Sequence, residues 1–196
     1  MQSTDESLIN AHCRGEPTAF AELVRRYGGS VLRYLTRMSG NREQADDLFQ
    51  ETFKRVHEKA HTFRGSRFKP WLFTIATRVA VDGLRKRKRT QVLSLNRRLD
   101  CSDENSEHIG AVAVADNSFN PSEKAEKAER AEQVRQTIEL LPAKQRATLV
   151  LAYYQQLTYR EVAEVLGCSI GTVKVQMYRA LRTLAKKLPD VSGKTG

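Results

Sequence analysis

Hydrophobic residues recur at three- and four-residue steps through the N-terminal half of the chain, which is the period of an amphipathic helix. The pattern runs through three segments, and Pro70 stands near the start of the third, where a proline suits the first helical turn. Strict alternation of apolar and polar residues is missing, so no strand pattern competes. The sequence therefore predicts an all-α fold. The three helical segments are residues 17–38, 41–63 and 68–89.

A second pair of helices is predicted near the C-terminus. Thr158 and Glu161 have the spacing of a capping box, which begins a helix. Gly167 ends that helix, because glycine tolerates the left-handed conformation of a tight turn, and Ser169 can cap the next one. The arrangement indicates a helix-turn-helix. Its buried residues are expected to be Val162, Val165 and Leu166 on the first helix and Ile170, Val173, Met177, Leu181 and Leu184 on the second.

The outer face of the second helix in this pair is polar and basic. Such a face can reach base edges in the major groove and contact the flanking phosphates. The alternative is an αα-hairpin with a solvated charged face, but the cap, the glycine turn and the basic face together favour DNA binding. The residues expected at duplex DNA are Arg160, Ser169, Thr172, Lys174, Val175, Gln176, Arg179 and Arg182.

Charge divides the chain into three parts. The formal net charge is +10, which favours a polyanionic partner such as nucleic acid, with +8 over residues 1–91, −4 over 92–132 and +6 over 133–196. The acidic part contains the turn signal Asn120-Pro121, followed by an Ala/Glu/Lys run typical of a helix. We expect two small helical domains, 1–95 and 133–188, a flexible acidic linker over 96–132 that becomes helical from about residue 122, and a tail over 189–196.

The first basic part holds a second candidate DNA site. Five consecutive cations, residues 85–89, exceed what is needed to complement a helix dipole, which favours phosphate contact. Before them, aromatic residues (Phe63, Phe68, Trp71 and Phe73) alternate with cations, a mixture suited to single-stranded DNA, because bases stack on rings while cations meet phosphates. Some of these aromatic residues also belong to the core, and for Trp71 burial and exposure are equally expected.

The helix between these features has an acidic outer face that carries Asp46, Asp47, Gln50 and Glu51. Because DNA repels carboxylates, this face favours contact with another protein, and ordinary solvated surface is the alternative.

In this order, the segments resemble one family, the extracytoplasmic-function sigma factors of the sigma-70 family. The string "DDLFQETF" is similar to the family's region-two core helix, and "PWLFTIATRVAVDGLRKRKR" to its promoter-melting helix. The string "LPAKQRATLVLAYYQQLTYREVAEVLGCSIGTVKVQMYRALRTL" is similar to its region four. The resemblance covers about residues 15–95 and 133–188. Two positions depart from the common pattern: Val175-Gln176 replaces Ser-Arg, and Arg78 replaces Asn, so no promoter sequence is carried over.

The resemblance implies a sigma factor that binds core RNA polymerase and directs it to promoters. The −35 element would be read as duplex by the helix-turn-helix, and the −10 element would be opened and held as a single strand, with the cost of flipping a base offset by pocket contacts. An anti-sigma factor is implied as regulator. Polymerase contacts fall on Asp47, Gln50 and Glu51, and −10 contacts on Phe63, Arg64, Arg67, Lys69, Trp71, Arg78, Asp82, Arg85, Lys86, Arg87, Lys88 and Arg89.

Other functions fit the sequence less well. A conventional helix-turn-helix regulator, which binds duplex DNA alone, explains only the C-terminal part, and an adaptor without DNA contact leaves both basic parts unexplained. In a nuclease, Asp46 and Asp47 would hold magnesium, but adjacent helical residues point about 100° apart. We expect no enzyme activity, no cofactor and no metal: the three cysteines are sparse, and the His57/His61 pair lacks further ligands. Without a signal peptide or a long apolar run, the chain is expected to be cytoplasmic and not inserted in a membrane.

Overall fold

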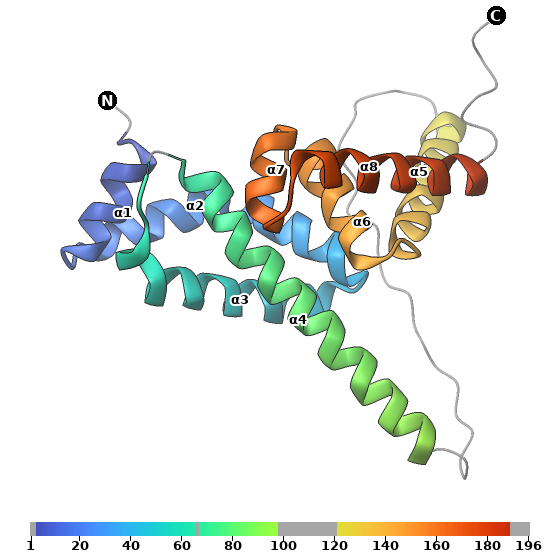
Figure 1. Ribbon diagram of the computed structural model, residues 1–196, viewed down its shortest axis with the longest axis horizontal. Helices are drawn as coiled ribbons and strands as arrows, with labels where there is room; N and C mark the ends of the chain where they lie inside the picture. Colours follow the sequence, from blue (N-terminus) through green and yellow to red (C-terminus); the bar gives the residue numbers. More distant parts are fainter. Residues whose placement is uncertain (1–2, 66, 98–120, 189–196) are drawn as a thin grey trace, which may run out of the picture.

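The structure is a computed structural model that describes residues 3–65, 67–97 and 121–188, and all regular structure in these ranges is helical (Figure 1). The predicted all-α fold is confirmed. Side chains are described for 3–65, 67–90 and 128–188. The N-terminal elements are α1 (Asp5–Cys13), α2 (Pro17–Ser39), α3 (Arg42–Lys59), the 3-10 turn η1 (Ala60–Thr62) and α4 (Phe68–Arg97). The C-terminal elements are α5 (Pro121–Glu139), α6 (Ala143–Leu149), the π-helical turn η2 (Val150–Tyr154), α7 (Tyr159–Leu166) and α8 (Ile170–Lys187).

Helices α2, α3 and α4 pack into one core in the N-terminal half. Tyr34 of α2 is fully buried, and its hydroxyl lies 2.8 Å from the hydroxyl of Thr77 on α4. Its ring meets Phe73 edge to face, with ring centroids 5.3 Å apart. On the other side of α4, Gly83 lets α3 approach closely, because a Cβ there would stand 2.8 Å from Leu48 Cδ2. The α4 helix is therefore held against both of its neighbours before its basic end begins.

Helix α1 was not predicted from the sequence. Its segment is polar, yet Leu8, Ile9 and Ala11 are buried. The Thr4 side chain caps its start, and the Asp5 carboxylate accepts hydrogen bonds from side chains of α2. Three buried residues in a nine-residue helix leave too weak a period to recognise, and the contacts that hold α1 come from distant residues.

The C-terminal half is a four-helix unit in which α8 packs on α6 and α7. The predicted helix-turn-helix is present, as α7 and α8. Two of its predicted core residues are wrong: Ile170 is 43% exposed and Leu181 is 51% exposed. Both residues lie at the edge of the apolar stripe of α8, where the packed helices do not cover them. The inner side of α8 instead consists of Val173, Met177, Ala180 and the half-buried Leu184.

The two halves pack against each other. Helix α7 lies on α4, and α2 contacts α5, α6 and η2. The expected helix at 122–140 is present as α5, which begins at Pro121. Residues 98–120 of the predicted linker and the predicted tail over 189–196 lie outside the described residues.

No described helix combines the length and apolar character needed to cross a membrane.

The buried hydroxyl pair between α2 and α4 gives a test of the core. Tyr34→Phe removes the bond to Thr77 and is expected to lower the free energy of unfolding by about 1 kcal/mol. Urea denaturation followed by circular dichroism measures this loss. Tyr153→Phe makes the same chemical change at a side chain that is 66% exposed, and its stability should equal that of the wild type. Equal losses in both variants would contradict the role of the buried bond.

Candidate nucleic-acid interface

The turn between α7 and α8 is fixed by caps on both sides. The Thr158 hydroxyl accepts from the Glu161 backbone, and the Glu161 carboxylate accepts from the Thr158 backbone at 2.9 Å, so both arms of the capping box are present. Gly167 has φ +62°, in the left-handed region. The Ser169 hydroxyl accepts from the Thr172 backbone at 3.1 Å. These contacts hold α8 at a defined angle to α7, as a recognition helix requires.

The outer face of α8 is open to solvent. Gln176 is half-buried, and the Ser169 hydroxyl is already used by the α8 cap, where it also bonds the Thr172 hydroxyl. The residues predicted for duplex DNA that are exposed are Arg160, Ser169, Thr172, Lys174, Val175, Arg179 and Arg182. Tyr178, with an exposed fraction of 65%, lies on the same helix and was not among the predicted contacts.

Four aromatic rings cluster around the start of α4. Phe63, Phe68 and Trp71 have ring centroids 5.4 to 5.9 Å apart, and Tyr27 of α2 lies 5.3 Å from Phe68. Phe68 is buried, whereas Phe63 and Trp71 are half-buried. The last two therefore serve the core and also present ring surface on which a base can stack. Phe73, included in the aromatic pattern, is fully buried and serves the core alone.

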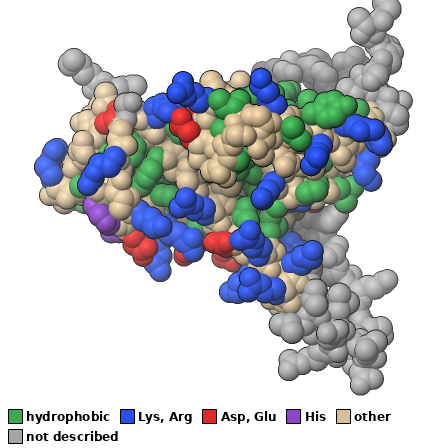
Figure 2. Space-filling view, viewed as in Figure 1, with side chains coloured by type: hydrophobic (Ala, Val, Ile, Leu, Met, Phe, Trp, Pro, Cys, Tyr) green, Lys and Arg blue, Asp and Glu red, His purple; other side chains and the backbone are tan. Residues whose placement is uncertain are grey.

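The described end of α4 is strongly basic. All five cations of residues 85–89 are exposed, and Figure 2 shows Lys and Arg side chains gathered over this end of the helix. Asp82 differs from them, because its carboxylate lies 3.8 Å from Arg85 and 4.0 Å from Arg55. Asp82, Arg85, Lys86 and Arg89 line a shallow open hollow with Thr90. The exposed cations along this end of α4 favour contact with an extended polyanion.

The acidic face of α3 is partly paired within the helix. Asp47 and Gln50 are exposed. Glu51 accepts from Arg55 at 2.6 Å, and Asp46 lies 3.4 Å from Arg42. The free acidic surface is therefore narrower than the sequence indicated and is centred on Asp47.

Two cations predicted to meet DNA contact the C-terminal half in this structure. Arg67 donates to both carboxylate oxygens of Glu164 at 2.8 Å, and Lys69 donates to the backbone carbonyl of Gln155 at 2.6 Å. Sequence reasoning missed these partners, because no local signal connects residues so far apart. By contrast, Arg64 bonds backbone carbonyls of its own turn, and Arg78 is exposed.

Glu161 also lies near Arg67, at 3.9 Å. The Thr158 backbone N–H, with smaller contributions from the Thr158 hydroxyl and Arg67, holds the pKa of Glu161 below its ordinary value against partial desolvation. Glu161 is therefore ionised at neutral pH, and α7 presents two negative charges to Arg67.

Among the described residues, no cluster of three or more His, Cys, Asp or Glu side chains could hold a metal ion. His57 stacks near His12, with ring centroids 4.8 Å apart.

Family models match both halves of the chain. The model described as Sigma-70 region 2 matches residues 23–90, and that described as Sigma-70, region 4 matches residues 131–184. The ECF RNA polymerase sigma factor SigW of Bacillus subtilis is 32% identical over 91% of this chain and 93% of its own length. The chain belongs to the extracytoplasmic-function sigma factors. The RNA polymerase sigma-H factor of Pseudomonas aeruginosa is similar as well, with 30% identity over 95% of both chains.

Two solved structures share this fold. CnrH, solved in complex with the cytosolic domain of CnrY, superposes with a TM-score of 0.67 at 23% identity, covering 97% of this chain and all of CnrH. RpoE of Bartonella quintana, solved with the anti-sigma factor NepR, gives 0.65 at 24% identity, covering 88% of this chain and 98% of RpoE.

Family membership decides between the functions that the sequence left open. The protein is a promoter-directing sigma factor and not a stand-alone helix-turn-helix regulator. Its family is not a family of enzymes. From here on, region 2 denotes α1–α4 and region 4 denotes α5–α8.

The capping box of α7 gives a test of the helix-turn-helix. Thr158→Ala removes the hydroxyl that accepts from Glu161 and is expected to cost about 1 kcal/mol of stability. The urea midpoint measures the loss. Thr158→Ser keeps the hydroxyl and should recover most of it, whereas an equal loss in both variants would show that the cap is not what stabilises α7.

Proposed function

We propose that this sigma factor uses three separate surfaces: α3 for core polymerase, the outer face of α8 for duplex −35 DNA, and the turn before α4 with the α4 helix for single-stranded −10 DNA. One observation supports the proposal most strongly: α8 follows a short turn with a helix cap at its end, and the basic face of α8 is exposed to solvent. Because core polymerase is cytoplasmic, we propose that the protein acts in the cytoplasm.

The exposed part of the α3 face supports the polymerase contact. Asp47 and Gln50 stand one helical turn apart and are both open to solvent. We propose that Glu51 supports this surface indirectly, because it forms an ion pair with Arg55 on the next turn of the helix. A carboxylate within a basic domain favours a protein partner that offers cations.

Three kinds of contact are available on α8. Lys174, Arg179 and Arg182 supply cations for phosphates or guanine edges, and Gln176 can pair with an adenine edge. We propose that Ser169 acts by accepting a hydrogen bond from the Thr172 backbone, which orients the first turn of α8, and not by contacting DNA itself. Arg160 lies at the start of α7, where a cation meets the DNA backbone on the way into the groove.

The start of α4 supplies the surface for the separated −10 strand. Half-buried Phe63 and Trp71 are held by the aromatic cluster, so a base can stack on them without a large loss of side-chain freedom. Arg78 and the five cations of residues 85–89 follow along the same helix for phosphate contact. Asp82 restrains Arg85 and so shapes this basic surface.

An anti-sigma factor is part of the proposal. RpoE was solved with an anti-sigma factor and CnrH with the cytosolic domain of CnrY. We infer a protein regulator for this chain from those two relatives, without an assignment of the surface that it covers.

The polymerase surface is tested by co-elution with sigma-free core RNA polymerase. The wild type should co-elute, and Asp47→Arg combined with Gln50→Ala should abolish it, because a cation then faces the cations of the partner. Glu16→Arg makes the same charge reversal at the exposed start of α2, away from the proposed contact, and should co-elute normally. Co-elution of the α3 variant at wild-type level would exclude this surface.

The α8 surface is tested by promoter binding of the holoenzyme as a function of salt. Arg179→Ala should weaken binding by about 1–3 kcal/mol if it reads a base, or reduce the salt slope by about one if it contacts a phosphate. Lys144→Ala removes an exposed cation from α6 and should leave both quantities unchanged. Equal effects of the two variants would mean that α8 contributes only general positive charge.

A further inference from the structure

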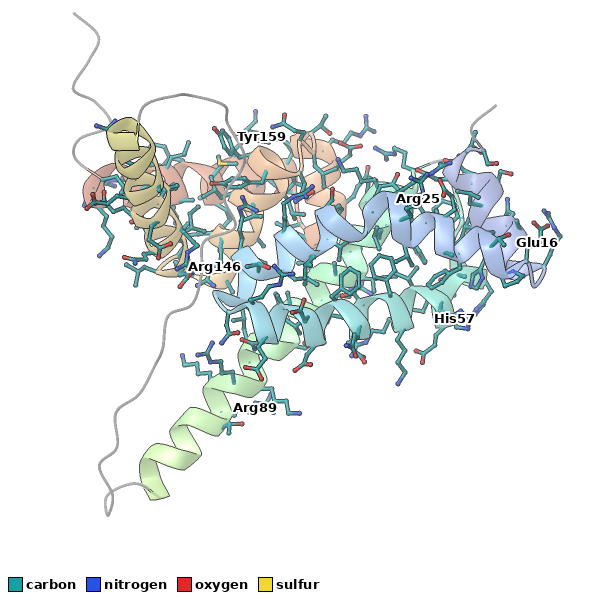
Figure 3. All side chains as sticks on the ribbon, turned by 180° about the vertical axis from the view of Figure 1, so that it is seen from behind. Glu16, Arg25, His57, Arg89, Arg146 and Tyr159 are labelled. Carbon is teal, nitrogen blue, oxygen red and sulfur yellow. The ribbon has the colours of Figure 1, made fainter. Side chains whose placement is uncertain are left out.

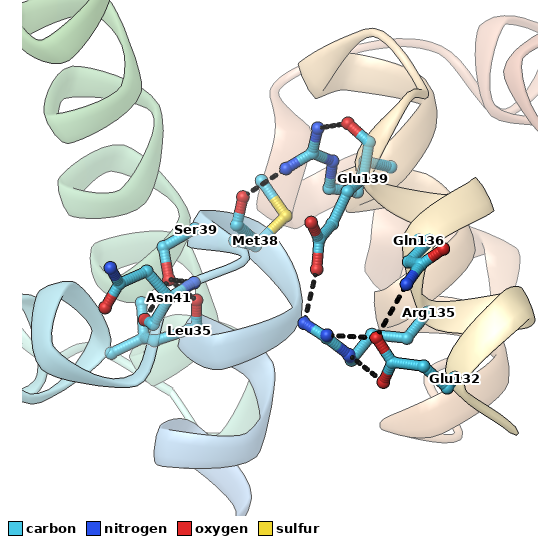
Figure 4. A network of polar contacts seen from close by, with 9 residues as sticks. Leu35, Met38, Ser39, Asn41, Glu132, Arg135, Gln136 and Glu139 are labelled. Carbon is cyan, nitrogen blue, oxygen red and sulfur yellow. Dashed lines mark hydrogen bonds and ion pairs between the residues drawn. The ribbon is translucent and has the colours of Figure 1, made fainter. Parts of the chain in front are cut away.

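Region 2 and region 4 are joined by polar contacts as well as by packing. Arg146 of α6 is buried, and its guanidinium donates to the backbone carbonyls of Met38, Glu139 and Leu141. Met38 lies at the end of α2, Glu139 is the last residue of α5, and Leu141 lies in the turn between α5 and α6. Figure 3 shows Arg146 between these helices, and Figure 4 shows the carbonyl of Met38 accepting this bond beside the Glu139–Arg135–Glu132 ion pairs.

The turn after α6 makes further contacts with region 2. The side-chain amide of Gln155 donates to the carbonyl of Ser30 at 3.3 Å, and the guanidinium carbon of Arg37 lies 3.9 Å from the centre of the Tyr154 ring. The Gln155 carbonyl also accepts from Lys69. Because these groups come from α2, α4 and η2, they fix the position of α7, which follows η2 in the chain.

The position of α7 brings two carboxylates to one cation of the proposed −10 site. Glu164 binds Arg67 through both of its oxygens, and Glu161 lies at the other side of the same guanidinium. Both bonds come from the Arg67 Nη2 nitrogen, so the carboxylate occupies one of the guanidinium nitrogens with which Arg binds a phosphate. Lys69, the next proposed cation, is occupied by the Gln155 carbonyl.

The outer face of α8 is left open by the same arrangement. Lys174, Arg179 and Arg182 are exposed and have no carboxylate partner among the described ion pairs. Two cations of the proposed −10 surface therefore bond groups of region 4, while the basic face of α8 remains open to solvent.

We propose that α7 is an internal competitor of the −10 strand, whose carboxylates hold Arg67 in place of DNA phosphate, so that the closed chain can meet duplex DNA through α8 before its −10 site opens. This rests on the −10 surface proposed above, to which Arg67 belongs as part of the turn before α4 and Lys69 as part of the first turn of α4. Binding of the −10 strand to Arg67 and packing of α7 against Arg67 then compete. The equilibrium constant of each process is lowered by the other by the same factor.

The contact that holds the competitor is accessible to salt. The Arg67 side chain is 49% exposed and that of Glu164 is 44% exposed, so ions screen the pair. An exposed pair of this kind changes an equilibrium by about threefold. The Arg67 pair acts together with the buried contacts of Arg146 to hold the regions together, so loss of the pair shifts the chain from the closed arrangement toward an open one.

Closure is measured in the full chain by energy transfer between dyes on Cys13, which is exposed, and on Lys186→Cys at the end of α8, in a background with Cys101→Ser and Cys168→Ser. Glu164→Arg should lower transfer, and adding Arg67→Glu to it should restore transfer through a reversed pair. Circular dichroism verifies that each variant is folded. If transfer is the same in wild type, single and double variants, the pair does not hold the regions together and the proposal is overturned.

Competition is measured with a labelled short single strand of randomised sequence. Glu164→Gln should bind it about threefold more tightly than the wild type at low salt. Glu16→Gln removes the same charge from the start of α2 and should bind as the wild type does. Equal gains in both variants would show an effect of net charge alone and overturn the competition.

Arg67→Ala distinguishes the proposed role of Arg67 as a −10 contact from the proposed competition by α7. It should bind the strand more weakly than Glu164→Gln does, because the cation itself is lost. If Arg67→Ala and Glu164→Gln bind the strand equally well, Arg67 is not a strand contact, and both its −10 role and the competition fail. The energy transfer then still reports whether α7 holds the cation.

Discussion

A buried positive charge constrains the arrangement of the whole chain. The Arg146 guanidinium lies between the two family regions, where a charge without acceptors would be very costly. Burial lowers the pKa of Arg146, yet a guanidinium stays ionised in proteins, so the charge must be met by acceptors. It is met by carbonyls at the ends of α2 and α5, groups that have no partner within their own helices. One side chain thus satisfies the helix ends of both regions and requires them to lie together.

Features that depend on near neighbours were predicted well from the sequence. Helices α2, α3 and α4 follow from an apolar period. The turn before α8 follows from Thr158, Glu161, Gly167 and Ser169, whose roles are settled within a few residues. The polar and basic side of α8 follows from the same helical geometry. The chemistry of the candidate surfaces could therefore be stated before their positions were known.

Features that depend on distant partners could not be predicted. Arg67 and Glu164 are 97 positions apart, and Arg146 and Met38 are 108 apart, so no spacing rule connects them. Helix α1 is held by bonds from α2 rather than by a strong pattern of its own. Ile170 and Leu181 look like core residues in a helical projection, but only the packed unit shows that the stripe ends before reaching them.

The hydrogen bond from the Arg146 guanidinium to the Met38 carbonyl bears on how freely the two regions can be recombined by engineering. A transplanted region 4 carries its own caps, so its helix-turn-helix can form on any host. To pack against region 2 in the same way, however, region 4 needs a backbone carbonyl at the end of α2 that can accept a hydrogen bond, and a cation opposite α7. A hybrid that lacks either feature is expected to keep the fold of α7 and α8 but to lose contacts that hold region 4 against region 2, so the two sides of this boundary must match each other.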